Sequence, residues 1–117
     1  MSRNYLSANS ELRQGDFLLS NNEKWKAVFQ DDGNFVIYGP SPVWASGTDG
    51  AEAVRLCMQD DCNLVMYDTS NQVIWDTGSS TAPCITCRLQ LTDDGTLVIY
   101  REAEVVWTSE FSKGNKK

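Results

Sequence analysis

The chain has 117 residues, a formal net charge of −6 and no histidine. Its length fits one hydrophobic core, so we expect a single domain spanning residues 1–117. The acidic balance argues against a nucleic-acid partner, whose phosphates need a basic surface. Without histidine, Ser-His and Cys-His nucleophile pairs and imidazole-containing zinc sites are excluded.

The N-terminal segment from Met1 to Gly15 is polar and shows no apolar stretch typical of a secretory signal. No run of roughly eighteen apolar residues follows, so we expect no membrane insertion. The C-terminal tail, about residues 113–117, carries three lysines and is expected to be solvated and flexible.

Three similar segments then follow one another along the chain. They cover residues Phe29–Tyr38, Met58–Tyr67 and Leu91–Tyr100. Each is followed after a short break by a tryptophan in an extended-looking segment, namely Trp44, Trp75 and Trp107. A motif that recurs in this register indicates a threefold internal repeat.

Each repeat has the pattern of a β-hairpin. In the first one, Trp25, Ala27 and Phe29 alternate with their neighbours, which is typical of a strand. Residues 31–34, with the sequence Asp-Asp-Gly-Asn, have the composition of a hairpin turn. No stretch has a convincing helical pattern. The sequence therefore predicts an all-β protein built from three similar sheets related by approximate threefold symmetry.

The repeated tryptophans are expected to point toward the common axis of the three sheets. Trp44, Trp75 and Trp107 would bury a large apolar surface there, so we interpret them as core and not as platforms for stacking sugars. Trp25, which lies outside the repeated position, is also expected to belong to the core.

Five residues of each hairpin are spaced two apart, which sends their side chains toward one face of a strand. In the first copy these are Gln30, Asp32, Asn34, Val36 and Tyr38. In the second copy they are Gln59, Asp61, Asn63, Val65 and Tyr67. A carboxylate that only accepts hydrogen bonds, beside amides that donate and accept, suits the paired hydroxyls of a sugar.

The alternative interpretation is hairpin architecture alone, because Asp and Asn favour turns while Val and Tyr favour strands. That alternative leaves the pairing of Gln with Tyr in both complete copies unexplained.

From about Asn4 to Phe111, the chain resembles the bulb-type (monocot-type) mannose-binding lectins, and in particular their members in fish skin mucus. The signature of that family is this Gln-x-Asp-x-Asn-x-Val-x-Tyr repeat. The resemblance implies a β-prism of three antiparallel sheets with pseudo-threefold symmetry and calcium-independent mannose binding, with no cofactor. It also implies that Asp and Asn hold the 2-hydroxyl, Gln the 3-hydroxyl and Tyr the 4-hydroxyl, while Val packs on the ring. We call the first copy site 1 and the second copy site 2.

The third copy departs from the motif at two positions. Thr92 replaces the Gln and Thr96 replaces the Asn, whereas Asp94, Val98 and Tyr100 remain. Each lost hydrogen bond is worth about 1 kcal/mol, which a weak site cannot spare. We therefore expect this third site to be inactive or to accept something else.

The three Asp-Asp pairs at positions 31/32, 60/61 and 93/94 raise the question of an enzyme or a metal site. Adjacent residues of a strand point apart, whereas a glycosidase needs two carboxyl groups that converge on one bond. No copy has the spacing of a calcium-binding loop. We interpret the pairs as turn residues and expect neither catalysis nor a bound metal.

Four cysteines occur, at positions 57, 62, 84 and 87. The Cys-x-x-Cys spacing of the last two would also suit a four-thiolate zinc site. Two disulfides are the favoured state, with three possible connectivities, and they imply an oxidising compartment. The family resemblance favours Cys62–Cys87 and leaves Cys57–Cys84 as the second pair. An oxidising compartment conflicts with the missing secretory signal.

Two hypotheses for function follow. The first is an extracellular or mucus-secreted lectin that binds mannose-rich glycans on cells or microbes and acts in surface defence by agglutination. The alternative is a protein-interaction or inhibitory protein of the same fold, in which sugar binding is incidental. The segment Glu104–Phe111 reads as a terminal strand, and the lectin family exchanges that strand between partners, so a homodimer is expected.

Overall fold

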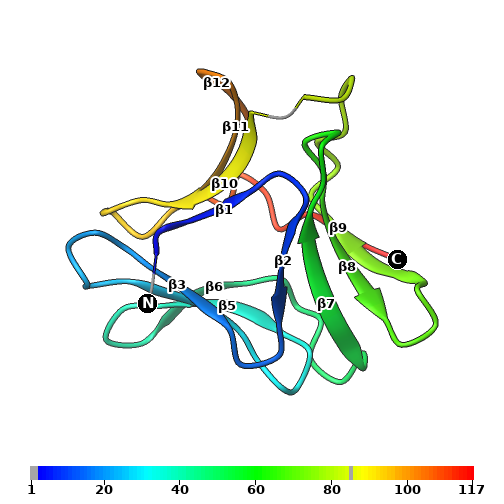
Figure 1. The fold of residues 1–117 in the computed structure, drawn as a ribbon. Helices are drawn as coiled ribbons and strands as arrows, with labels where there is room; N and C mark the ends of the chain where they lie inside the picture. The colour runs from blue at the N-terminus through cyan, green and yellow to red at the C-terminus, as the bar shows by residue number, and fades with distance from the viewer. Residues whose placement is uncertain (1–2, 85) are drawn as a thin grey trace.

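The computed structural model describes residues 3–84 and 86–117, and in this part of the chain the strands form three antiparallel sheets without a helix (Figure 1). The all-β prediction and its three antiparallel sheets are therefore confirmed. Within the same residues, no helix is long and apolar enough to span a membrane.

Each sheet contains one of the three repeats. The first sheet has the order β3-β4-β5-β6, with strands Phe17–Leu19, Lys26–Phe29, Phe35–Tyr38 and Pro42–Ala45. The second has the order β13-β9-β8-β7-β2, with strands Asn115–Lys116, Val73–Asp76, Leu64–Asp68, Ala53–Met58 and Ser10–Arg13. The third has the order β1-β10-β11-β12, with strands Tyr5–Ser7, Cys87–Leu91, Leu97–Arg101 and Glu104–Thr108.

The N-terminal segment links all three sheets. Strands β1, β2 and β3 follow one another within residues 5–19, yet β1 joins the third sheet, β2 the second and β3 the first (Figure 1). Each of them pairs with the first strand of a repeat hairpin. The segment thus supplies every repeat with an additional strand that comes from a distant part of the sequence.

The hairpins share their local irregularities. In each repeat, the pairing between the second and third strands shifts immediately before the motif tyrosine, at Tyr38, Tyr67 and Tyr100. The turn before the second strand places one residue at positive φ, which is Gly33, Cys62 or Gly95. Cys62 stands where the other two copies use glycine, although a non-glycine residue is uncommon in this conformation.

The repeated tryptophans meet at the centre. The ring centroids of Trp44, Trp75 and Trp107 lie 5.9 to 6.4 Å apart in edge-on pairs. Trp75 is fully buried. Edge-on aromatic pairs at this spacing are favourable beyond their buried area. The three sheets are therefore packed on a shared aromatic cluster.

Trp25 has a different role. It is partly buried, and its indole N–H donates to the Asp93 carbonyl oxygen at 3.1 Å. A Cβ atom at Gly95 would come within 2.7 Å of its ring. Trp25 thus connects the first sheet to the turn of the third repeat instead of lying on the common axis.

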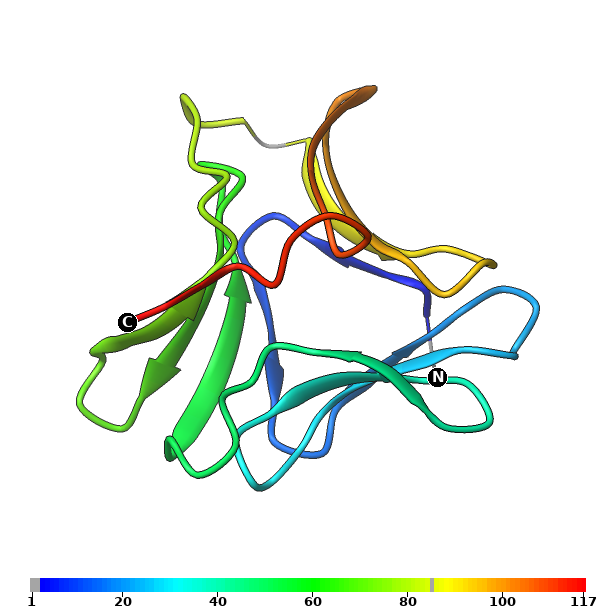
Figure 2. The same ribbon diagram turned by 180° about the vertical axis from the view of Figure 1, so that it is seen from behind.

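The C-terminal tail differs from the flexible end that the sequence suggests. It passes from the third sheet to the second, where β13 pairs with β9 (Figure 2). On the way, the Trp75 indole donates to the Lys113 carbonyl oxygen at 2.7 Å and the Trp44 indole donates to that of Ser112 at 3.3 Å. Contacts with the tryptophan cluster thus give the tail a defined path.

Candidate functional site

Both complete motifs lie on the outer face of a hairpin. In site 1, Phe35 and Ile37 of β5 are fully buried toward the core, so the alternating Val36 and Tyr38 face outward. The Gln30 N–H donates to the Asn34 carbonyl oxygen at 2.9 Å and closes the turn. The second hairpin repeats this arrangement between Gln59 and Asn63, at 3.0 Å.

The turn orients the aspartate of each motif. Asp32 Oδ1 accepts the Asn34 backbone N–H at 3.0 Å, and Asp61 Oδ1 accepts that of Asn63 at the same distance. In site 2, the other carboxylate oxygen accepts the Ser80 hydroxyl at 3.0 Å. In each site, the turn thus fixes one carboxylate oxygen of the aspartate. The direction of the second carboxylate oxygen is thereby also set.

The asparagine of each motif is held through its carbonyl oxygen. Asn34 Oδ1 accepts hydrogen bonds from Ser46 Oγ, Gly47 N and Thr48 N at 3.0 to 3.1 Å. These hydrogen bonds fix the orientation of the Asn34 side-chain amide. Its NH2 group therefore faces outward and can donate to a ligand. No acceptor for that amine lies within hydrogen-bond distance in the part of the chain that the structure describes.

Site 2 uses the matching residues. Asn63 Oδ1 accepts from Thr77 Oγ1 at 3.0 Å and from Ser79 N at 3.2 Å. Sequence reasoning missed these supporting residues. Their signal was present, because a Ser/Thr-Gly-Thr/Ser triplet follows one residue after the repeated tryptophan in both complete copies.

The glutamine and tyrosine of each motif are bonded to each other. Gln30 Nε2 donates to the Tyr38 hydroxyl, and Gln59 Nε2 donates to that of Tyr67. Since each phenol oxygen accepts from an amide, its own proton remains available to a ligand. The valine between them is only 3–4% exposed, which leaves a smaller apolar surface than the sequence suggests.

The two sites differ beside this valine. Val65 pairs with Asp76 across β8 and β9, whereas Val36 pairs with Ala45 across β5 and β6. Asp76 Oδ2 accepts from Asn63 Nδ2 at 3.4 Å and also faces Lys117 Nζ at 3.5 Å. The second site therefore has an additional carboxylate that the motif does not predict.

The third copy is arranged differently. The Thr92 hydroxyl donates to Asp94 and accepts the Thr96 N–H at 3.2 Å. This hydrogen bond from Thr92 lowers the pKa of the Asp94 carboxyl. A cavity of about 230 Å³ borders these residues together with Val98 and Tyr100. The third site thus keeps the hairpin and the carboxylate but offers no side-chain amide at the two substituted positions.

Cavity volume does not identify site 1 and site 2. A cavity of about 680 Å³ lies among β1, β2 and β3 and contacts none of the motif residues. Smaller ones, of about 520 and 260 Å³, border site 1 and site 2 respectively. The motif residues themselves form a shallow outer surface.

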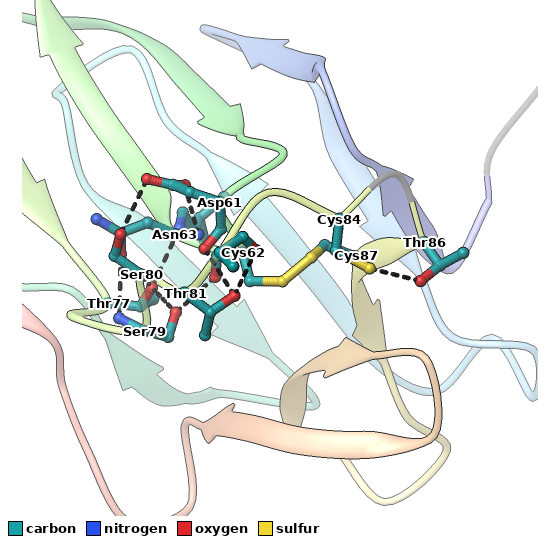
Figure 3. The surroundings of a disulfide bond; sticks show 12 residues. Asp61, Cys62, Asn63, Thr77, Ser79, Ser80, Thr81, Cys84, Thr86 and Cys87 are labelled. Carbon is teal, nitrogen blue, oxygen red and sulfur yellow. Dashed lines mark hydrogen bonds between the residues drawn. A yellow bond between two sulfur atoms is a disulfide. The ribbon is translucent and has the colours of Figure 1, made fainter.

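The predicted Cys62–Cys87 disulfide is confirmed. It joins the turn of the second hairpin to the start of β10, with the two Cα atoms 5.3 Å apart (Figure 3). Cys62 is thereby fixed directly beside Asn63. Because these two sulfur atoms bind each other, the alternative of a four-thiolate zinc site is wrong. In the described part of the chain, no group of three or more His, Cys, Asp or Glu is placed to hold a metal ion.

The predicted Cys57–Cys84 pair is wrong, since both thiols are free. Cys57 alternates with the buried Leu56 and Met58, so it points away from the core. The Cys84 N–H instead donates to the Asp60 carbonyl oxygen at 2.5 Å. Cys84 thus lies beside the turn of the second hairpin, whereas Cys57 lies within β7.

Comparisons with known proteins agree with this geometry. No protein-family model matches the chain. The sequence is 58% identical over 113 residues to the B-type lectin plumieribetin of Scorpaena plumieri, an alignment that covers 97% of this chain and 100% of that protein. The chain therefore belongs to the bulb-type (B-type) mannose-binding lectin family.

Two solved structures show the same fold. A monomeric monocot mannose-binding lectin from Gastrodia elata matches with a TM-score of 0.83 and 30% identity, over 93% of this chain and 98% of that one. The mannose-specific agglutinin of snowdrop, Galanthus nivalis, in complex with methyl α-D-mannoside, matches with a TM-score of 0.78 and 31% identity, over 95% and 99%.

Proposed function

We propose that this chain binds mannose-containing glycans, independently of calcium, through site 1 and site 2. The observation that carries the proposal is a shared hydrogen-bond arrangement. In both sites the turn holds the aspartate, Ser or Thr residues hold the asparagine oxygen, and the glutamine is bonded to the tyrosine. The third copy lacks the side-chain amides of this arrangement.

Each group then has a defined task. In site 1, the axial 2-hydroxyl of mannose donates to the Asp32 carboxylate and accepts from the Asn34 amine. Gln30 holds the 3-hydroxyl and Tyr38 donates its proton to the 4-hydroxyl, while Val36 contacts the ring. Asp61, Asn63, Gln59, Tyr67 and Val65 have the same roles in site 2. The snowdrop relative in complex with methyl α-D-mannoside supports this choice of ligand.

A shallow site of this kind binds one sugar weakly, at about −4 kcal/mol or near-millimolar affinity. Several sites on linked chains raise the apparent affinity for a surface that displays many copies of the glycan. We therefore propose that the chain acts outside the cell as a homodimer that agglutinates cells or microbes in surface or mucus defence, without enzymatic activity.

Titration calorimetry tests the two sites. Mannose should bind with two equivalents per chain, with or without a chelator, whereas galactose should not bind. Asp32→Ala and Asp61→Ala should each remove one equivalent, and the double variant should remove both. Asp31→Ala is the matched control, because Asp31 is the exposed neighbour of Asp32 outside the motif. Unchanged mannose binding by the double variant would refute the site assignment.

A further inference from the structure

A cavity of about 260 Å³ continues site 2 across β7 toward the edge strand β2. Gln59 and Tyr67 of the motif also belong to the wall of this cavity. Its other walls include polar side chains from the two strands, namely Ser10, Glu11, Arg55 and Cys57. A ligand held by Gln59 and Tyr67 therefore faces the cavity directly.

Arg55 is fixed in place beside the motif. Its guanidinium lies over the Tyr67 ring, 4.8 Å from the centroid, and donates to Asn71 Oδ1 at 2.8 Å. The Glu11 carboxylate lies 3.6 Å from Arg55 Nη1. Both side chains are about 30% exposed, so a ligand can reach them. A fixed donor beside a carboxylate acceptor matches adjacent hydroxyl groups, which donate and accept.

Site 1 lacks this arrangement. The residue opposite Tyr38 in the register is Lys26, whose ammonium lies 4.1 Å from the centroid of the Phe17 ring. The cavity beside site 1 is lined by residues 14–15, Val28 and residues 30–32, and neither Tyr38 nor a basic residue belongs to its wall. A sugar chain that enters this cavity from site 1 contacts no guanidinium in the cavity wall.

We propose that the cavity beside site 2 is a subsite for a second sugar residue, linked to the mannose in site 2 through an oxygen held by Gln59 or Tyr67. The ligand is then a mannose-containing oligosaccharide, whose second ring contacts Arg55 and Glu11. The volume fits one ring, because pockets for whole drug-sized ligands begin at about 300 Å³. Site 2 is thereby an oligosaccharide site and site 1 a monosaccharide site. This inference rests on the proposed mannose binding.

Single-site proteins separate the two cases. Asp32→Ala leaves site 2, and Asp61→Ala leaves site 1. Each is titrated with methyl α-D-mannoside and with mannobioses of 1→2, 1→3, 1→4 and 1→6 linkage. For site 1, a disaccharide should bind no more than about twofold better than the monosaccharide, because it offers two residues to one site. For site 2, the 1→3 or the 1→4 linkage should bind at least about tenfold better, which corresponds to one or two net hydrogen bonds.

Two further variants test whether the higher affinity for the disaccharide comes from contacts in the cavity. In the Asp32→Ala background, Arg55→Met keeps the length of the side chain but removes its donors, and Glu11→Gln removes the charge of the acceptor. Both should lower the ratio of disaccharide to monosaccharide affinity toward the value of site 1. This ratio corrects for any general weakening of site 2.

Equal ratios in the two single-site proteins would overturn the subsite, as would a high ratio that survives both Arg55→Met and Glu11→Gln. If neither single-site protein binds methyl α-D-mannoside, the proposed function fails instead. The two failures are thus distinguishable.

Discussion

Asp76 accepts a hydrogen bond from the Asn63 side chain at 3.4 Å, at the position where site 1 has Ala45. In site 1 both N–H groups of the Asn34 side-chain amide are free to donate to a sugar, whereas in site 2 one N–H of the Asn63 side-chain amide already donates to a carboxylate of the protein. The two motifs are identical in sequence at all five positions. The difference between the two sites comes from the strand that follows each hairpin, which is β6 in site 1 and β9 in site 2.

We expect Asp76→Ala to strengthen mannose binding at site 2 by about twofold, since a long hydrogen bond lies at the weak end of 0.5–1.5 kcal/mol. Ala45→Asp should weaken site 1 by a similar factor. Calorimetry of these changes in the Asp32→Ala and Asp61→Ala backgrounds, respectively, isolates each effect. Weaker binding by Asp76→Ala would mean that Asp76 holds the sugar directly.

The third site should resist a simple repair. Thr92→Gln with Thr96→Asn restores the motif, and Ser109 corresponds to the Ser46 and Thr77 that bond the asparagine oxygen. The backbone N–H groups of Glu110 and Phe111, however, donate to Thr108 instead of turning toward residue 96. Thr48 and Ser79 of the other repeats correspond to Phe111, which is 83% exposed. We therefore expect the double variant to keep two mannose equivalents per chain under conditions that saturate sites 1 and 2.

Adding Glu110→Gly and Phe111→Thr to that variant should supply the supporting triplet and raise the stoichiometry to three. Phe111→Thr with Glu110→Gly alone is the control and should stay at two. A full third equivalent in the first double variant would show that the supporting residues are dispensable.

The sequence predicted what local periodicity encodes. The alternation that sends Tyr38 outward and Ile37 inward is a property of one strand, and the repeat of Trp44 along the chain indicated a common core. The roles of Arg55 and Asp76 could not be predicted in this way. Arg55 meets Glu11 only because β2, from the distant N-terminus, pairs with β7, and Asp76 meets the tail only because β13 pairs with β9.

Cysteine pairing was likewise beyond local patterns. The correct Cys62–Cys87 pair came from the family resemblance. The incorrect Cys57–Cys84 pair followed by elimination, which assumes that every thiol is oxidised. In the structure both thiols are free, and Cys57 lies on the outer face of β7 between Leu56 and Met58.

The disulfide should contribute strongly to stability. Cys62→Ala with Cys87→Ala opens a crosslink between residues 25 positions apart, which should cost about 3 kcal/mol of unfolding free energy. Cys62→Gly with Cys87→Ala should be less harmful by about 1 kcal/mol, because residue 62 has a φ of 68° and glycine adopts this conformation without a steric penalty.

Urea unfolding of the two double variants measures this difference directly. Gly33→Ala, at the matching position of the first turn, should show a similar penalty relative to the unmodified chain. If the two Cys62 variants are equally stable, the backbone conformation at this position carries no cost.

The two free thiols should react at different rates. The hydrogen bond with the Thr86 hydroxyl lowers the pKa of Cys84, whereas burial raises the pKa of Cys57 despite the nearby Arg55. Because the thiolate is the nucleophile, iodoacetamide at neutral pH should modify Cys84 first, and modification of Cys57 should need a more alkaline solution. Peptide mass spectrometry follows each site, with Cys57→Ser and Cys84→Ser as assignment controls.

Cys57 also reports on the occupancy of site 2. It pairs with Val65 in the register, so a sugar on Val65 covers it. Saturating mannose should therefore slow alkylation of Cys57 and leave that of Cys84 unchanged, and Asp61→Ala should abolish this protection whereas Asp32→Ala should not. Protection that persists in Asp61→Ala would place the bound sugar elsewhere than at site 2.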